Sequence, residues 1–384
     1  NDSLLRWQIW PSWSDWQAYR PGVISYRQGT IARQDAFLID AYEPRFQKHY
    51  WQGLQLNDPV TGFFNASYVP HHKLLGVDEL KSSAYELHYR LTHYYSRVPV
   101  TQLNFDESKF KYRNLEFMFS RNFTARSNIE LSFWDRRDGD AFARSDIQGT
   151  QIYIKGTHQF NNKWLVHASW LNNQFEREES FGYNIGDPAT FNFSRFSTTP
   201  LRNGADTEVK QSIIRAGIHR KKEDAENEDF RLAMHRKVDL RRLDNQNVLT
   251  GYEVRNLGMH VWKRVNAGSK LNLDLSARAD HFETDDSAAV QLNSWSQFSG
   301  VADLDFKLSE SIHIHGRTAY TLREDRSVLM NSASIRVQVL ENLELNGNAG
   351  FGEELPSIQS LYWKADGFSG DENLNNETVY HASG

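Results

Sequence analysis

Cysteine is absent from all 384 residues, so the chain forms no disulfide, no thiolate zinc site and no cysteine nucleophile. No apolar run reaches the roughly 18 residues that a membrane-spanning helix requires. The charge has no strong excess of either sign, with 44 basic and 49 acidic residues and a net charge of −5, which argues against a nucleic-acid partner. Residues 1–10 lack the basic start and apolar centre of a signal peptide. We therefore expect the chain to start after a removed signal or within a longer protein.

Aromatic residues, in contrast, are abundant, with 11 Trp, 16 Tyr and 23 Phe. Trp and Tyr are enriched at membrane interfaces, where one ring meets both lipid and water. A soluble carbohydrate-binding β protein also presents aromatic side chains, so composition leaves both classes open.

Apolar and polar residues alternate over most of the chain after about residue 85. Ile129, Leu131 and Phe133, for example, alternate with Glu130 and Ser132. This period of two predicts β-strands with one apolar and one polar face. The polar faces of these strands carry Arg215, Arg231, Asp274, Arg278, His313, Arg317 and Arg336. Such residues would face water around a soluble sandwich, or a wet lumen inside a barrel.

The connections between these strands favour the barrel. Short links at 124–127, 161–163, 266–269, 309–311 and 341–342 alternate with longer segments at about 135–148, 173–207, 239–248, 282–294 and 324–329. Tight turns at one rim and long loops at the other are typical of outer-membrane barrels. The sequence therefore predicts a mainly β fold, an antiparallel transmembrane β-barrel wall of about 14 strands. Four tryptophans near strand ends, Trp134, Trp170, Trp262 and Trp295, are predicted to belong to an aromatic girdle.

The first 80 residues show a different pattern. Trp7, Trp10, Trp13 and Trp16 recur at helical spacing, which predicts an amphipathic helix over 4–19. Short strands are expected at 23–26, 36–40 and 50–56. We therefore predict a small α+β domain over 1–82 and barrel wall over 83–384.

Two stretches resemble the TonB-dependent receptor family. The first is YWQGLQLNDPVTG at 50–62, followed by YVP at 68–70, and it is similar to the plug pattern of that family. Its Asn-Asp-Pro with a following glycine favours a tight chain reversal. The candidate plug-motif residues are Gly53, Asn57, Asp58, Pro59, Gly62 and Pro70.

The second stretch is FGEELPSIQSLY at 351–362, followed by GDENLNNE at 370–377. It resembles a barrel strand of the family that ends in a Pro-Ser and Leu-Tyr loop, although residues 371–372 replace the usual Asn-Pro. The candidate barrel-loop residues are Pro356, Leu361, Tyr362, Gly370 and Leu374.

The resemblance implies a barrel of 22 strands, of which this chain holds about 14, truncated at the C-terminus, with a partial plug at the N-terminus. It implies an outer-membrane receptor-transporter, a monomer in outer-membrane lipid, that takes up a scarce siderophore, vitamin or oligosaccharide. Outer loops near 135–148, 173–207 and 353–377 would bind the solute, and a periplasmic TonB-like protein would supply energy. The alternatives are a passive porin-like barrel and a soluble carbohydrate-binding β protein.

Other candidate sites are weaker. His313 and His315 share one strand face, Asp135, Asp138 and Asp140 have part of a calcium-loop spacing, and His71 and His72 adjoin Pro70. None has a full ligand set, so we expect no metal site and no cofactor. The glycines at 347–352 are interpreted as part of a strand. No Ser/His/Asp set, carboxylate pair or P-loop stands out, so we expect no enzyme.

Overall fold

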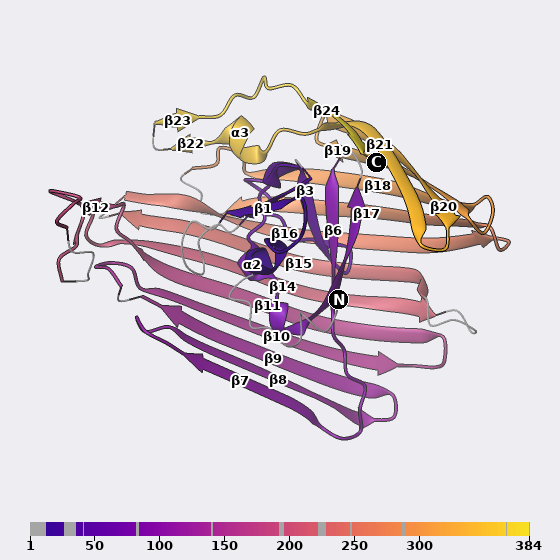
Figure 1. Ribbon diagram of the computed structural model, residues 1–384, viewed down its shortest axis with the longest axis horizontal. Coiled ribbons are helices and arrows are strands. Elements are labelled where there is room, and N and C mark those ends of the chain that lie inside the picture. Colours follow the sequence, from indigo (N-terminus) through magenta and orange to yellow (C-terminus); the bar gives the residue numbers. More distant parts are fainter. Residues whose placement is uncertain are drawn as a thin grey trace.

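The computed structural model describes residues 13–26, 36–40, 42–81, 84–139, 141–191, 196–221, 228–245, 248–285, 289–365 and 367–383. One antiparallel sheet of fourteen strands dominates the fold (Figure 1). This confirms the predicted fold class and strand count. The sheet is hereafter called the wall.

The wall strands are β7 (Val100–Glu107), β8 (Arg113–Thr124), β9 (Ser127–Asp138), β10 (Ile147–Gln159), β11 (Trp164–Glu179), β14 (Ala205–Lys221), β15 (Glu228–Asn245), β16 (Val248–Ala267), β17 (Leu271–Asp285), β18 (Ser294–Lys307), β19 (Ile312–Arg323), β20 (Arg326–Leu340), β21 (Leu343–Glu354) and β24 (Glu377–Ser383). They pair in chain order, with β7 and β24 at the two edges. Within the described residues these two edge strands do not pair with each other. No helix in the same residues is long and apolar enough to cross a bilayer.

Burial along the wall strands is inverted relative to a soluble sheet. On β15, His235 and Lys237 are 4% and 2% exposed, whereas Met234, which precedes His235, is 58% exposed. On β16, Leu257 is 60% exposed and its neighbour Asn256 only 5%. The polar face thus points to the concave side and the apolar face outward, the arrangement that a lipid-embedded barrel requires.

Connections alternate between two ends of the wall. The turn rim is formed by the links 125–126, 160–163, 268–270, 308–311 and 341–342, and the loop rim by 139–146, 180–204, 286–293 and 355–376. The predicted loop at 324–329 is wrong, because β19 and β20 are joined only by Glu324 and Asp325, and 326–329 continue the ladder. The predicted loop at 239–248 is also largely strand, since β15 extends to Asn245. Polar residues beyond the apolar band still pair, so composition hides these strand ends.

The 180–204 and 355–376 loops carry small elements of their own. The first contains the hairpin β12 (Tyr183–Asn184) and β13 (Thr199–Pro200). The second contains helix α3 (Ile358–Tyr362) and the hairpin β22 (Lys364–Ala365) and β23 (Phe368–Ser369).

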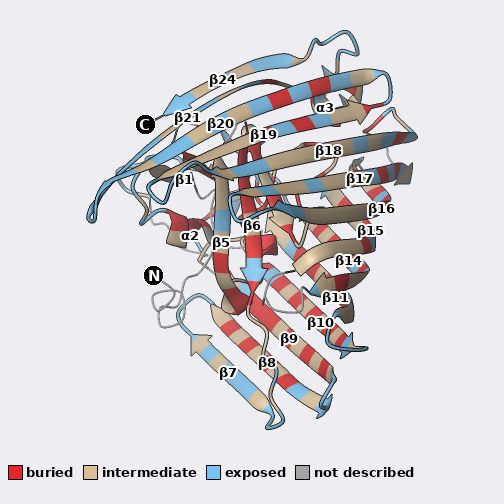
Figure 2. Cartoon of the chain, turned by 90° about the vertical axis from the view of Figure 1, so that its right-hand side faces the viewer, coloured by how far each residue is buried: buried red, intermediate tan, exposed pale blue. Residues whose placement is uncertain are grey.

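A small domain from the N-terminal part of the chain lies on the concave side of the wall (Figure 2). It contains α2 (Trp13–Gln17), the hairpin β1 (Val23–Tyr26) and β2 (Ala36–Ile39), and a four-stranded sheet in the order β4-β3-β6-β5. Those four strands are β3 (Gln47–Trp51), β4 (Leu54–Gln55), β5 (Leu74–Lys81) and β6 (Tyr85–Leu91), and short 3-10 turns occupy Pro44–Phe46, Ala66–Tyr68 and His71–Lys73. We call this unit the inner domain.

Three sequence predictions about this domain change. The strand expected over 50–56 is a hairpin, because Gln52 and Gly53 both adopt positive φ and reverse the chain. The helix expected over 4–19 is observed over α2, and residues 1–12 lie outside the described part. The domain boundary predicted at 82/83 moves, because β6 pairs with β3 and β5 and the wall starts at Val100. The β6 sequence, YELHYRL, alternates between apolar and polar residues as a wall strand does, so alternation alone does not show which sheet the strand joins.

The inner domain packs against one part of the wall through apolar side chains. Trp51 and Leu87 of the inner domain share a buried cluster with Tyr153, Phe175 and Ile213 of β10, β11 and β14. Trp134 belongs to the same cluster, and Trp295 is buried at 2% exposure in a second one. The girdle prediction is therefore wrong for these two tryptophans, because each lies on the inward face of its strand.

Candidate functional site

Four plug-motif residues, Asn57, Asp58, Pro59 and Gly62, form one tight turn of the inner domain, hereafter called the plug turn. The Asn57 side chain accepts a hydrogen bond from the His49 N–H (2.9 Å) and donates to the carbonyls of Gln47 (2.9 Å) and Gly62 (2.8 Å). Asp58 Oδ1 accepts from the N–H groups of Val60 and Thr61, both at 2.9 Å. An Asn-Asp pair followed by Pro59 and a positive-φ glycine thus closes the reversal that the sequence predicts.

This turn touches the wall through the same aspartate. The Tyr252 hydroxyl of β16 donates to Asp58 Oδ2 at 2.7 Å, and Arg241 Nε of β15 lies 3.7 Å from that oxygen. Lys237 Nζ donates to the Asn57 carbonyl at 2.8 Å. The motif therefore both shapes the turn and attaches it to two neighbouring wall strands.

Gly53 permits a close approach between the β3–β4 hairpin and the wall. A Cβ at Gly53 would lie 2.5 Å from the His260 imidazole, whereas one at Gly62 would meet nothing within 4 Å. Beside it, the Arg215 guanidinium of β14 donates to both the side chain and the carbonyl of Gln52, the latter at 2.7 Å. A larger residue at Gly53 would force the hairpin away from these partners.

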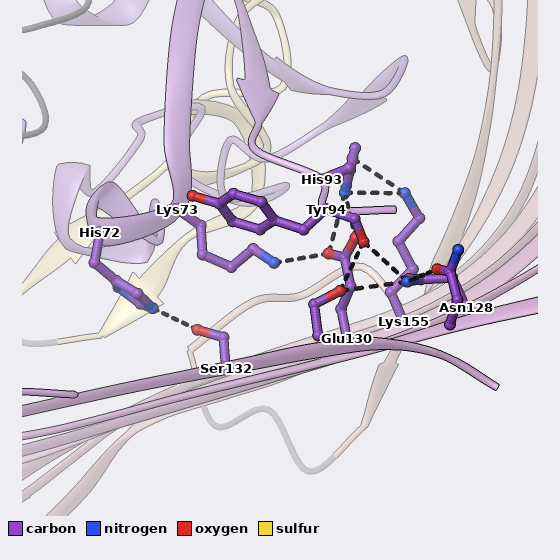
Figure 3. Close-up of polar contacts among 10 residues, drawn as sticks. His72, Lys73, His93, Tyr94, Asn128, Glu130, Ser132 and Lys155 are labelled. Carbon is purple, nitrogen blue, oxygen red and sulfur yellow. Dashed lines mark hydrogen bonds and ion pairs between the residues drawn. The ribbon is translucent and has the colours of Figure 1, made fainter. Parts of the chain in front are cut away.

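Pro70 precedes Lys73, which belongs to a buried ionic cluster with Glu130, His93 and Lys155 (Figure 3). Its carbonyl accepts the Lys73 N–H at 2.8 Å, and Lys73 Nζ donates to Glu130 of β9 at 2.8 Å with both side chains almost fully buried. His93 Nδ1 lies 3.1 Å from Glu130, and Lys155 Nζ of β10 lies 3.0 Å from His93 Nε2. Burial lowers the pKa of Lys73, although Glu130 opposes the shift, and burial also lowers the pKa of His93.

The barrel-loop residues form the compact start of the 355–376 loop. Ser357 caps α3 by accepting the Ser360 N–H at 3.0 Å, and Leu361 is buried. Gly370 is required by close approach, since a Cβ there would lie 2.5 Å from the Leu361 carbonyl. Two arginines of the β19–β20 turn hold this loop: Arg323 donates to the Pro356 carbonyl (2.5 Å), and Arg326 donates to the Leu374 carbonyl (2.6 Å). Tyr362 and Trp363 pack against the buried apolar cluster that contains Ile358 and Trp295.

The two motifs meet at the loop rim. The Gln359 N–H donates to the Val60 carbonyl at 2.8 Å, and Val60 shares a buried apolar cluster with Ile358, Phe282 and Trp295. The sequence marks both stretches as motifs, but their contact joins residues about 300 positions apart and leaves no local signal.

A cavity of about 610 Å³ lies between the inner domain and strands β16–β20. The inner domain contributes the plug turn, Tyr50 and Glu86, and the wall contributes mostly polar side chains such as Asn256 and Arg278. Loop residues 354–360 line it as well. The lining therefore combines charges of both signs with aromatic rings, which suits a polar solute.

One ionic group crosses between the inner domain and the wall at this cavity. Arg317 Nη2 donates to both oxygens of Glu86 on β6, at 2.8 and 2.7 Å, and Arg317 Nη1 donates to Asp303 of β18 at 2.7 Å. Burial alone would raise the pKa of Glu86, but Arg317 and His88 outweigh it and hold that pKa at about 2. The alternation of β19 predicts that Arg317 lies on a polar face, but the sequence does not mark Glu86 as its partner.

The weaker candidate sites do not gather ligands. The described residues contain no group of three or more His, Cys, Asp or Glu able to hold a metal. His315 lies 3.6 Å from Asp303, and Asp135 pairs with Arg113 at 2.5 Å. His72 contacts Ser132, whereas the His71 side chain and Asp140 lie outside the described part. The glycines at 347–352 lie in β21, as interpreted.

Wall, inner domain and loops together define the fold of the TonB-dependent outer-membrane receptors, as the sequence resemblance predicts. By sequence, no protein-family model and no curated protein matches the chain.

Solved structures do match. The siderophore receptor PirA from Acinetobacter baumannii superposes with a TM-score of 0.72 at 10% identity, over 94% of this chain and 61% of that one. The copper transporter OprC gives 0.70 at 9% identity, over 91% and 61%. The alcaligin outer-membrane receptor FauA from Bordetella pertussis gives 0.59 at 9% identity, over 89% and 59%. The chain thus spans about three-fifths of the length of these proteins, all of them transport receptors.

Proposed function

We propose that the chain belongs to an outer-membrane transporter that captures a scarce solute at the loop rim and admits it past the inner domain, which acts as a plug. The observation that carries this proposal is the position of the inner domain. It occupies the concave side of the wall and is held there by buried contacts such as Lys73–Glu130 and Glu86–Arg317. A domain so placed obstructs passage, and a passive pore has no need of one.

The solute class we propose is a metal chelate of the siderophore type. Support comes from the solved structures, two of which are siderophore or alcaligin receptors and one a copper transporter. The cavity volume of about 610 Å³ and its mixed polar and aromatic lining agree with a chelate of moderate size.

The energy source we propose is a periplasmic TonB-like partner. Opening a path past the inner domain would separate a buried ion pair such as Glu86–Arg317, which costs free energy. A pull from the periplasm would supply that work.

The test is uptake of an iron-loaded siderophore panel by cells that make the full-length protein, with and without the coupling protein. We expect uptake of at least one chelate, lost when the coupling protein is deleted. Uptake that persists without the coupling protein would instead favour the passive porin, and liposome swelling by the purified protein would then confirm that alternative. A protein that stays in buffer without detergent would contradict the outer-membrane location.

A further inference from the structure

The inner domain contacts the wall in two different ways on its two sides. Toward β9–β14 the interface is apolar and closely packed, with Tyr153, Phe175 and Ile213 at 0–1% exposure. Toward β16–β20 the two parts are separated by the cavity. One side of the inner domain is thus attached to the wall, and the other faces space.

The cavity begins near the loop rim and ends part-way down the wall. On β18 the inward positions Trp295, Gln297, Ser299 and Val301 all line it, and the next inward position, Asp303, does not. On β19 the inward positions from Arg323 to Arg317 line the cavity, and the next inward position, His315, does not. Asp303 and Arg317 are direct register partners, so the cavity ends on both strands at one level.

The ionic group of Glu86, Arg317 and Asp303 lies at the level where the cavity ends. Arg317 of β19 donates to Asp303 on the neighbouring wall strand β18 and to both oxygens of Glu86 on the inner domain. The charges thus bridge wall and inner domain where the cavity stops. His88, 3.2 Å from Glu86, also lines the cavity.

From this placement we infer that the solute passes on the β16–β20 side of the inner domain, and that the Glu86–Arg317 ion pair is the inner gate of that path. The inference rests on the proposed transport function and specifies its route. Separating Glu86 from Arg317 exchanges an ion pair for charges that the adjoining wet cavity can hydrate, and Asp303 keeps Arg317 compensated. Opening the other side would expose the apolar cluster to water, which opposes movement there.

A second buried ion pair gives a matched control. Lys73–Glu130 also joins inner domain to wall, at 2.8 Å, but on the attached side. Glu86→Gln and Lys73→Gln each remove one charge of a buried pair. Both substitutions should lower the stability of the protein, but only Glu86→Gln should make the path beside β16–β20 easier to open.

The experiment records K⁺ current through the full-length protein in planar bilayers while urea is raised to loosen the inner domain. In Glu86→Gln and Arg317→Gln we expect current at a lower urea concentration than in the parent. At a fixed urea concentration it should rise about tenfold, which corresponds to a loss of about 1.4 kcal/mol in closing free energy. Lys73→Gln should leave the onset of current unchanged. An earlier onset in Lys73→Gln than in Glu86→Gln, or equal onsets, would overturn the inference.

Cross-linking supplies the converse test, because the chain has no cysteine of its own. In the double variant Glu86→Cys/Arg317→Cys, a short bifunctional thiol reagent should abolish the urea-induced current. The same reagent on Lys73→Cys/Glu130→Cys should leave that current in place. Current that survives the first cross-link and stops with the second would assign the path to the opposite side. Neither readout uses the solute or the coupling protein, so a failure here is distinguishable from a failure of the proposed function.

Discussion

The main-chain N–H of Gln359 donates a hydrogen bond to the carbonyl oxygen of Val60 across 2.8 Å. The two residues belong to the two stretches that carry the sequence resemblance, one in the plug turn and one in the 355–376 loop. Their contact brings the end of the inner domain to the loop rim, next to the cavity. The turn is therefore placed where a captured solute would touch both parts at once.

Asp58 is expected to stabilise this turn and its attachment to the wall. Asp58→Ala removes the acceptor of two main-chain N–H groups and of the Tyr252 hydroxyl, so it should lower the free energy of unfolding by about 1–3 kcal/mol. Asp58→Asn keeps an oxygen acceptor and should cost less. Thermal unfolding in detergent measures both. Equal losses in the two variants would contradict a role based on hydrogen bonding.

The two motif glycines make a matched pair that separates backbone strain from close approach. Both have positive φ, so replacement by alanine should cost each about 1–2 kcal/mol through strain. Gly53→Ala should cost more than Gly62→Ala, because only its Cβ meets the His260 imidazole. When each glycine variant also carries His260→Ala, the difference between their stability losses should become smaller. Chemical denaturation compares the variants, and a Gly62→Ala loss equal to that of Gly53→Ala would be inconsistent with the observed packing.

The contribution of an ion pair between inner domain and wall to the free energy of unfolding should depend on how deeply the pair is buried. Lys73→Met strands Glu130 in a buried site and should cost about 3–5 kcal/mol, reduced by the remaining contact of Glu130 with His93. Lys48→Met removes the partner of Glu354 in a pair whose side chains are 14% and 25% exposed, so water can partly hydrate Glu354 and the loss should be smaller than for Lys73→Met. Urea unfolding of the two variants gives the comparison. A larger loss for Lys48→Met would refute it.

Stability should fall below about pH 6.5, the ordinary pKa of histidine. Burial lowers the pKa of His49 well below this value, so the folded state excludes a proton that the unfolded state binds. The stability present above pH 6.5 is then lost progressively as the pH falls. In His49→Phe, which keeps an aromatic ring against Phe64, the melting temperature between pH 7 and pH 5 should depend less on pH. An unchanged pH profile would show that other groups dominate.

The sequence predicts those features that short-range patterns encode. Alternation along β15 and β16 predicts which side chains face outward, and the turn at Asn57–Gly62 follows from residues that bond to their own neighbours. It also predicts the strand count, because turn-rim links are short and polar.

What the sequence does not predict depends on contacts across long separations. The sequence places β6 in the wall because its apolar and polar residues alternate as in a wall strand, and this pattern carries no sign of the sheet that the strand joins. Trp134 and Trp295 were assigned to a girdle because their inward orientation depends on strand register. Glu86 was missed because its partner Arg317 lies 231 residues away.

The most direct test compares the environments of two adjacent β17 positions in the full-length protein, reconstituted in lipid vesicles. Spin labels at Ser276→Cys, which lines the cavity, and at Ala277→Cys, on the opposite face, report collisions with oxygen dissolved in lipid and with a water-soluble nickel complex. We expect the label at 277 to collide mainly with oxygen and the label at 276 mainly with nickel. The reverse pattern, or two equally dry sites, would contradict a wall that faces hydrocarbon outside and water inside.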